Sequence, residues 1–375
     1  MIPDSIFMRD SLYWHCFRKI QGIGQTRLRS LMSAFETGES AWHADAEALA
    51  ATGMSADTRE AILAGRASID PEREKEALER DGIRLLLSTD ETFSTLLREA
   101  PFPVSLLYVR GNFDEWNKPM VAIVGSRKHT AYGRQAAERI AEDLVRAGVV
   151  VVSGLAYGID SVAHGAALRT DGSTIAVLGD GLDDASIHPR EHLPLAKRIM
   201  ESGCLLSEYP PGTAAGKGTF PARNRIIAAL SLGVVVAEAA EKSGSLITAD
   251  HALECGRDVF AVPGSIFSPA STGTHKLIRD GAKLVRGTGD ILEELPLRTA
   301  TSSSDSKQGN GPKPIPENLS EAERKILSIL THEATHVDEI IKSSHLGTSD
   351  AGSALTMLEI KGLAKNIGGM NYIRV

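Results

Sequence analysis

One segment of the central region has the residue types of a phosphate-binding loop. Residues 121–124 are apolar and mostly β-branched, Gly125-Ser126-Arg127 follow, and residues 135–147 have the apolar spacing of a helix. Gly125 permits a tight turn, and the unpaired amides at a helix start attract an anion. The guanidinium of Arg127 matches a phosphate with two hydrogen bonds. The segment predicts a phosphate contact, although a single strand–turn–helix of this kind also occurs as plain scaffold.

A second segment offers groups that suit a nucleic-acid strand. Lys217 and Arg225 can neutralise phosphates, Asn224 can form hydrogen bonds, and the ring of Phe220 can stack on a base. Arg223 lies in the same Arg-Asn-Arg run at the start of an expected helix. The alternative is that the ring packs as a hydrophobic staple and the arginines form surface ion pairs.

Alternating strands and helices between residues 121 and 287 would bring both segments to one edge of a sheet. The expected strands are residues 121–124, 149–152, 174–178, 204–206, 234–237 and 258–262. Each leads into a loop rich in glycine or serine, and doubly wound folds bind ligands at the edge where such loops meet. The pattern predicts an α/β fold with a Rossmann-like, doubly wound, mostly parallel sheet that carries a nucleotide or nucleic-acid site.

The segments that precede the sheet are predicted to be helical over residues 1–70. A Gly-Ile-Gly turn at residues 22–24 opens a helix, as in helix-hairpin-helix and SAM-like modules, some of which hold a DNA phosphate on the hairpin amides. The alternative is a small packing domain. A charged helix at 71–80 and strands at 83–87 and 102–111 are then expected to extend the edge of the main sheet.

The C-terminal part fits a winged helix behind a Ser-, Gly- and Pro-rich linker. Its third helix, at residues 348–360, contains Asp350 and Glu359 but neither Lys nor Arg, whereas a helix in the major groove normally presents basic or amide side chains. We therefore favour a protein-contact or regulatory role over duplex reading. The predicted limits are 1–70 for the helical domain, 71–297 for the extended Rossmann-like domain with its core at 119–287, 298–318 for the linker and 319–375 for the winged helix.

The totals of the chain restrict the classes of function. The net charge of −7 argues against a protein that coats nucleic acid through bulk charge, so a nucleic-acid role needs a local basic groove. The sequence holds no run of about eighteen apolar residues that would predict a membrane span, and its first residues lack the pattern of a secretory signal. The three cysteines are far apart and outside metal-ligand spacing, so we expect reduced thiols in a cytoplasmic protein without a metal or cofactor.

Six motifs follow one another in the central region. They are Val-Ala-Ile-Val-Gly-Ser-Arg at 121–127, Val-Ser-Gly-Leu-Ala at 152–156, Ile-Ala-Val-Leu-Gly at 175–179, Phe-Pro-Ala-Arg-Asn-Arg at 220–225, Ser-Gly-Ser-Leu-Ile-Thr-Ala at 243–249 and Gly-Arg-Asp-Val-Phe-Ala-Val-Pro-Gly at 256–264. In this order they resemble the DprA/Smf family of DNA-processing proteins. The resemblance implies a protein without catalytic activity that binds and protects incoming single-stranded DNA during natural transformation and loads the RecA recombinase onto it. It also implies a homodimer formed through residues 259–285 and no membrane association.

The resemblance also assigns DNA contacts residue by residue. The family's phosphate-binding arginine matches Arg127, its lysine and phenylalanine match Lys217 and Phe220, and its asparagine and arginine match Asn224 and Arg225. The full set of candidate DNA-binding residues is Gly125, Ser126, Arg127, Gly154, Lys217, Phe220, Arg223, Asn224, Arg225, Ser243, Gly244 and Ser245. The pattern departs at His188, where tyrosine is common, and at His275, where asparagine is common, which leaves the loop geometry and the dimer contact there open.

An enzyme is the competing hypothesis. Asp160 and His164 are four residues apart on an expected helix, and Glu238 comes just after a strand, so a metal or general-acid role is conceivable. Rossmann-like enzymes that cleave nucleotide N-glycosidic bonds resemble this core, but they carry a glutamate in the loop that corresponds to residues 243–249, and this chain does not. We expect no catalytic residues, because two such residues are a weak signal and an Asp-His contact is more often a structural hydrogen bond.

Overall fold

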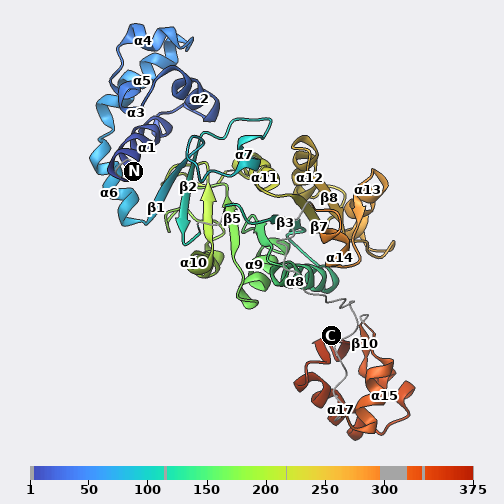
Figure 1. Ribbon diagram of the computed structural model, residues 1–375. Helices are drawn as coiled ribbons and strands as arrows, with labels where there is room; N and C mark the ends of the chain where they lie inside the picture. The colour runs from blue at the N-terminus through green and yellow to red at the C-terminus, as the bar shows by residue number, and fades with distance from the viewer. Residues whose placement is uncertain (1–3, 114–115, 217, 296–318, 332–333, 375) are drawn as a thin grey trace, which may run out of the picture. The chain divides into compact units, whose positions relative to one another are not determined.

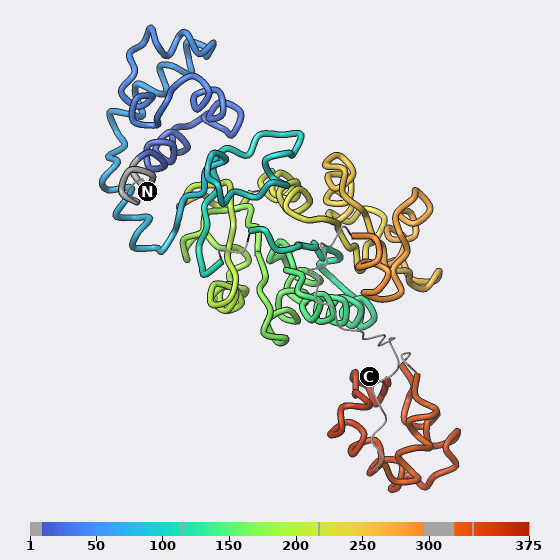
Figure 2. The backbone as a smooth tube through the Cα atoms, in the orientation of Figure 1, coloured from blue at the N-terminus to red at the C-terminus, as the bar shows by residue number. Residues whose placement is uncertain are grey.

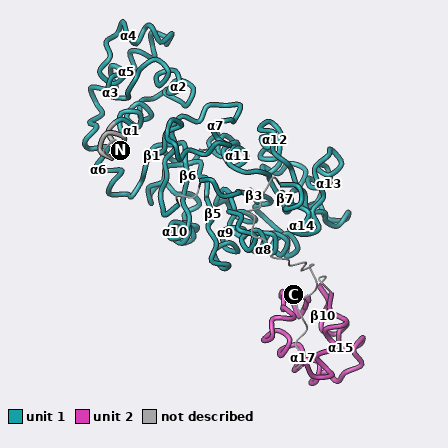
Figure 3. The backbone as a smooth tube through the Cα atoms, in the orientation of Figure 1, with its two compact units in different colours: residues 1–298 teal, residues 299–375 magenta. Residues whose placement is uncertain are grey.

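The computed structural model describes residues 4–113, 116–216, 218–295, 319–331 and 334–374, and the side chains from Asp10 onward. The chain divides into two compact units, Met1–Arg298 and Thr299–Val375 (Figure 3). The predicted linker, residues 298–318, lies outside the described residues. The predicted boundary at residues 70 and 71 falls inside the first unit.

The first part of this unit is helical, as expected. Its helices are α1 Asp4–Lys19, α2 Gln25–Ala34, α3 Gly38–His43, α4 Ala46–Ala51, α5 Ala56–Ser68 and α6 Pro71–Arg80. Short polar side chains start several of them, because Thr37, Asp45 and Ser55 each accept a hydrogen bond from an amide in the first turn. Phe17 of α1 packs in one core with Tyr108 of the main sheet, so this helical region is joined to the sheet.

The main sheet has the strand order β1-β2-β6-β5-β4-β3-β7-β8-β9 (Figure 1). Its strands are β1 Ile83–Leu87, β2 Leu106–Gly111, β3 Met120–Gly125, β4 Val150–Ser153, β5 Thr174–Leu178, β6 Cys204–Ser207, β7 Gly233–Glu238, β8 Asp258–Ala261 and β9 Lys283–Leu284. β1 and β2 pair antiparallel at one edge, β2 pairs antiparallel with β6, and all seven strands from β3 to β9 are parallel to one another. The α/β fold and the extended edge are confirmed.

Helices cover both faces of this sheet (Figure 2). They are α7 Thr95–Arg98, α8 Ala131–Arg146, α9 Ile159–Arg169, α10 Leu193–Ser202, α11 Thr219–Leu230, α12 Gly244–Glu254, α13 Thr272–Arg279 and α14 Thr288–Leu292, with 3-10 turns η1 Arg190–His192 and η2 Pro269–Ser271. Strand side chains alternate between the faces. Val121 and Ile123 of β3 pack with α8 and α9, whereas Ala122 and Val124 pack with α11 and α12.

The second unit is the predicted winged helix. It contains α15 Glu321–Ile329, β10 Thr335–His336, α16 Val337–Ser344, α17 Thr348–Ile360, β11 Ala364–Gly368 and β12 Asn371–Arg374, with the strands in the order β10-β12-β11. Ile326, Ile340 and Leu355, one from each helix, share its core. The exposed side of α17 includes Ser353, Thr356 and Glu359. Across the two described units, the structure contains no helix with the length and apolar character of a membrane span.

Candidate nucleic-acid interface

The loops that follow β3 to β8 meet at one edge of the sheet, because these six strands are parallel. The chain runs from β3 through β4 and β5 to β6 on one side and then returns to β7 on the other side of β3. The connections therefore diverge between β3 and β7. A doubly wound sheet binds ligands at such a point, since the neighbouring loops separate there.

Glu238, the last residue of β7, fastens the loop that follows β3. Its carboxylate accepts hydrogen bonds from the amide of Thr130 at 2.8 Å and from the hydroxyl of Thr130 at 2.6 Å. Its backbone carbonyl accepts from the amide of Ser126 at 2.8 Å. Thr130 in turn caps α8, so the helix begins four residues before the predicted residue 135. Arg127, which lies between these anchor points, remains exposed.

Two of the predicted site residues, Arg127 and Phe220, lie close together although they are far apart in the sequence. The guanidinium of Arg127 lies 5.7 Å from the centre of the Phe220 ring, within the range of a cation–π contact. Phe220 belongs to the first turn of α11 and is half-buried. The ring of His188, from the loop after β5, lies 5.9 Å from the same ring. An exposed cation beside a partly exposed ring is an arrangement that suits a phosphate next to a stacked base.

Asn224 lies beside the loop that leads into α12. Its side-chain amide donates to the carbonyl of Gly244 at 3.4 Å, which places it beside the start of α12. Ser243 caps this helix, and its hydroxyl lies 2.8 Å from the hydroxyl of Ser245. The structure therefore brings Asn224 together with the serine-rich loop. Lys217 lies outside the described residues.

Arg223 does not face the ligand side of the edge. Its side chain is only 4% exposed, and its guanidinium donates to the carbonyl of Gly154 at 2.6 Å and to the carbonyl of Val177. Asp160 and Asp180 are the nearby carboxylates that interact with it. Its burial and these bonds argue against the expected DNA contact, because they commit the guanidinium to joining the ends of β4 and β5 to α11. Gly154 leaves room for this arginine, because a Cβ at position 154 would lie 2.6 Å from the guanidinium.

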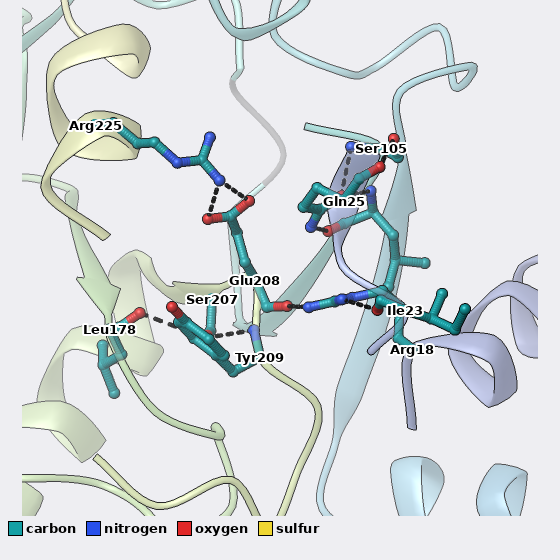
Figure 4. A network of polar contacts seen from close by, with 10 residues as sticks. Arg18, Ile23, Gln25, Ser105, Leu178, Ser207, Glu208, Tyr209 and Arg225 are labelled. Atoms are coloured by element: carbon teal, nitrogen blue, oxygen red, sulfur yellow. Dashed lines mark hydrogen bonds and ion pairs between the residues drawn. The ribbon is translucent and has the colours of Figure 1, made fainter. Parts of the chain in front are cut away.

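Arg225 also forms an ion pair within the chain, with Glu208, as Figure 4 shows. One of its nitrogens donates to both carboxylate oxygens of Glu208, at 2.5 and 2.6 Å, and its guanidinium lies 4.4 Å from the centre of the Phe102 ring. Burial raises the pKa of Glu208, and the charge of Arg225 opposes that shift. The backbone carbonyl of Glu208 accepts from Arg18 of α1 at 2.9 Å. This ion pair joins α11 to the loop before it and argues against the expected phosphate contact of Arg225.

The Gly-Ile-Gly turn and the residue after it join the N-terminal helices to the main sheet. Gln25, which follows it, accepts from the amides of Ser105 and Leu106 at 2.8 and 3.2 Å and donates to the carbonyl of Leu106 at 2.8 Å (Figure 4). Ile23 of the turn is buried, and its carbonyl accepts from Arg18. These contacts favour the packing-domain alternative over a phosphate site on the hairpin amides.

The groups that a catalytic site would need have structural partners. Asp160 accepts from the amide of Gly154 at 3.1 Å, and burial raises its pKa. His164 lies 2.8 Å from the hydroxyl of Thr174, and burial lowers its pKa to about 3. Glu238 is occupied by Thr130, as described above. Within the described ranges, no group of three or more His, Cys, Asp or Glu side chains is arranged to hold a metal ion.

The structural role of two residues, Glu208 and Glu238, was not predicted from the sequence. Glu208 and Glu238 each lie at the carboxyl end of a buried strand. Glu208 binds Arg225 of α11, and Glu238 binds Thr130, which is more than a hundred residues away in the chain. The signal was present, because an acidic residue directly after an apolar strand needs a buried partner. What the sequence could not supply was the identity of that partner.

Comparison with known proteins gives the family. The model of the DNA recombination-mediator protein A family matches residues 84–296, more than half of the chain, and the DprA winged helix domain matches residues 310–370. The Protein Smf of Synechocystis is 36% identical over 97% of this chain and 99% of its own length. The crystal structure of DprA from Streptococcus pneumoniae aligns with a TM-score of 0.66 and 36% identity over 76% of this chain and 98% of that one. The structure of DNA processing protein A from Helicobacter pylori, concerned with its single-stranded DNA binding mode, aligns with a TM-score of 0.51 and 31% identity over 56% and 94%. With this similarity along nearly its whole length, the chain belongs to the DprA/Smf family of DNA recombination-mediator proteins.

Proposed function

We propose that the chain binds single-stranded DNA at the carboxyl edge of its sheet, with little preference for sequence. The observation that carries the proposal is the pair of Arg127 and Phe220, an exposed cation on the anchored loop after β3 and a half-buried ring at the start of α11, 5.7 Å apart. These groups can contact a phosphate and the face of a base, and both features occur in every nucleotide. The Helicobacter pylori relative, whose structure concerns single-stranded DNA binding, supports the same ligand here.

The cellular role that we propose is protection of incoming single-stranded DNA in the cytoplasm and its transfer to RecA during natural transformation. The support is membership of a recombination-mediator family. We expect dimers that use residues 259–285, where Ile266 and Phe267 are 81% and 90% exposed. Apolar side chains this open to water favour a protein partner. For the winged helix we retain a protein-contact role, because α17 offers no Lys or Arg.

Fluorescence anisotropy with labelled oligo-dT, compared with a duplex of equal length across a salt series, tests the DNA proposal. Arg127→Ala and Lys217→Ala are expected to weaken binding to every sequence. Each is also expected to flatten the plot of log K against log salt by about 0.7, the value for one lost phosphate contact on a single strand. Arg139→Ala is the matched control, because Arg139 is an exposed arginine whose partner Asp143 keeps a second arginine, Arg146. Unchanged affinity in both edge variants would refute the proposed site.

Transfer to RecA is tested by the DNA-dependent ATPase activity of RecA on single strands coated with a single-strand-binding protein. The full chain should shorten the lag before hydrolysis, and Arg127→Ala should lose this effect. Release of free base from a nucleoside monophosphate by the purified protein would instead support the N-glycosidase alternative, which the structural bonds of Asp160, His164 and Glu238 disfavour.

A further inference from the structure

Tyr157 is an exposed ring on the loop between β4 and α9, at the same edge as Arg127 and Phe220. The residue is 42% exposed, yet its ring is held in place. Its hydroxyl donates to the carboxylate of Glu191 at 2.6 Å, and its ring meets that of His192 at 5.0 Å with an interplanar angle of 65°. His192 is fixed in turn, because its Nδ1 lies 2.8 Å from the carbonyl of Leu155. A ring that is both exposed and immobilised loses little entropy when a ligand covers it.

The loop that carries Tyr157 is pressed against the loop that carries Arg127. Gly158 has a φ of 84°, and a Cβ on it would collide with the carbonyl oxygen of Ser126 and the backbone of Arg127. The amide of Ile159 donates to the same carbonyl at 3.1 Å. On the other side of Tyr157, the buried Leu155 has a φ of 57°, a left-handed conformation that costs energy in a residue with a side chain. The backbone is therefore strained where it presents this ring beside the proposed phosphate contact.

The segment 188–192 connects the two rings. His188 lies 5.9 Å from the Phe220 ring at one end of it, and His192 packs on Tyr157 at the other. The amide of His188 donates to the buried carboxylate of Asp180 at 2.9 Å, which fixes the start of the segment. Phe220 and Tyr157 are thus two aromatic rings at the same edge, each with a histidine beside it. The guanidinium of Arg127 contacts the Phe220 ring, and the backbone of Arg127 packs against Gly158, next to Tyr157.

We propose that Tyr157, supported by His192, is a second base-stacking subsite for the single-stranded DNA that Phe220 engages. This inference rests on the proposed function and extends the path of the DNA strand from Arg127 after β3 and Phe220 at the start of α11 to the loop after β4. The carboxylate of Glu191 beside the ring would repel a phosphate, so the subsite takes the face of a base and leaves the backbone to Arg127 and Lys217.

The test uses full-length protein and anisotropy with oligo-dT of about 4 to 20 nucleotides. Tyr157→Ala should weaken binding of the longer oligonucleotides about tenfold, the effect of one lost base stack, and leave the shortest ones and the salt slope unchanged. Tyr157→Phe is the matched control, because it keeps the ring and loses the bond to Glu191, and it should bind like the wild type. An equal loss in Tyr157→Ala and Tyr157→Phe, or a loss that is the same at all lengths, would show that Tyr157 only supports its loop and would overturn the subsite.

Oligonucleotides with one abasic position supply a second readout that does not depend on the stability of a variant. The wild type should lose affinity at two separated positions, one for each ring, and Tyr157→Ala should become insensitive at one of them. Sensitivity at a single position in the wild type contradicts the subsite. A loss of binding in Arg127→Ala with no effect of Tyr157→Ala rejects the subsite alone, whereas a wild type that does not bind single strands rejects the proposed function and the subsite together.

Discussion

Replacement of Glu208 by glutamine should destabilise the first unit strongly. The side chains of Glu208 and Arg225 are 6% and 19% exposed, so the variant would leave a largely buried guanidinium without a counter-charge. One nitrogen of Arg225 is already buried without a hydrogen-bond partner. Breaking a buried ion pair by removing one member costs about 3–5 kcal/mol. We take the lower end, about 3 kcal/mol, because the Phe102 ring still faces the cation.

The loss should be visible in thermal and urea unfolding followed by circular dichroism. About 3 kcal/mol corresponds to a fall in melting temperature of roughly 5 °C for a unit of about 300 residues. Arg139→Gln, which removes one exposed ion pair on α8, should change stability by about 0.5 kcal/mol or less. The double variant Glu208→Gln with Arg225→Met removes the stranded cation and should recover most of the stability. A loss below about 1 kcal/mol in Glu208→Gln, or no recovery in the double variant, would refute this reasoning.

Further predictions concern the buried groups beneath the edge. Burial raises the pKa of Asp180 from 3.8 to about 7, so between these values the folded protein holds a proton that the unfolded chain has released. The contribution of Asp180 to stability therefore falls as the pH rises through this window. The stability of Asp180→Asn against urea should rise relative to the wild type up to about pH 7 and then level off. A difference in stability that does not vary with pH contradicts the prediction. Gly154→Ala should lower the melting temperature, because its Cβ would lie 2.6 Å from the Arg223 guanidinium, whereas Gly244→Ala, with nothing near its Cβ, should not. Arg225→Met should leave the salt slope of oligo-dT binding unchanged, and a flatter slope would show that Arg225 contacts a phosphate after all.

Local sequence patterns predicted the sheet because its strands are short apolar runs that end in glycine or serine. Residues 174–178 match β5, and the segments expected at 149–152 and 258–262 differ from β4 and β8 by one residue at their ends. The start of α8 was placed too late, since its first turn, Ala-Tyr-Gly-Arg, lacks the apolar spacing of the rest of the helix. Its cap, Thr130, depends on a carboxylate more than a hundred residues away.

The candidate site was predicted in part for the same reason. Arg127 and Phe220 were identified because a turn and a helix start expose them locally. Arg223 and Arg225 have the same side chain and lie two residues apart, but Arg223 binds carbonyls at the ends of β4 and β5, whereas Arg225 binds Glu208. Their burial depends on how the strands are ordered in the sheet. No local pattern around an Arg-Asn-Arg run contains that information.

The bond between Glu238 and Thr130 has a consequence for how this edge can change over evolution. Ser126 and Thr130 hold the loop in place, while the two residues just after Ser126, Arg127 and Lys128, are exposed. The residues that anchor the loop and the residues that we propose to contact the ligand are thus different positions within five consecutive residues. Mutations at 127 and 128 can alter what the loop binds at little expense to the fold, so the loop is a place where new ligand preferences could arise or be installed by design.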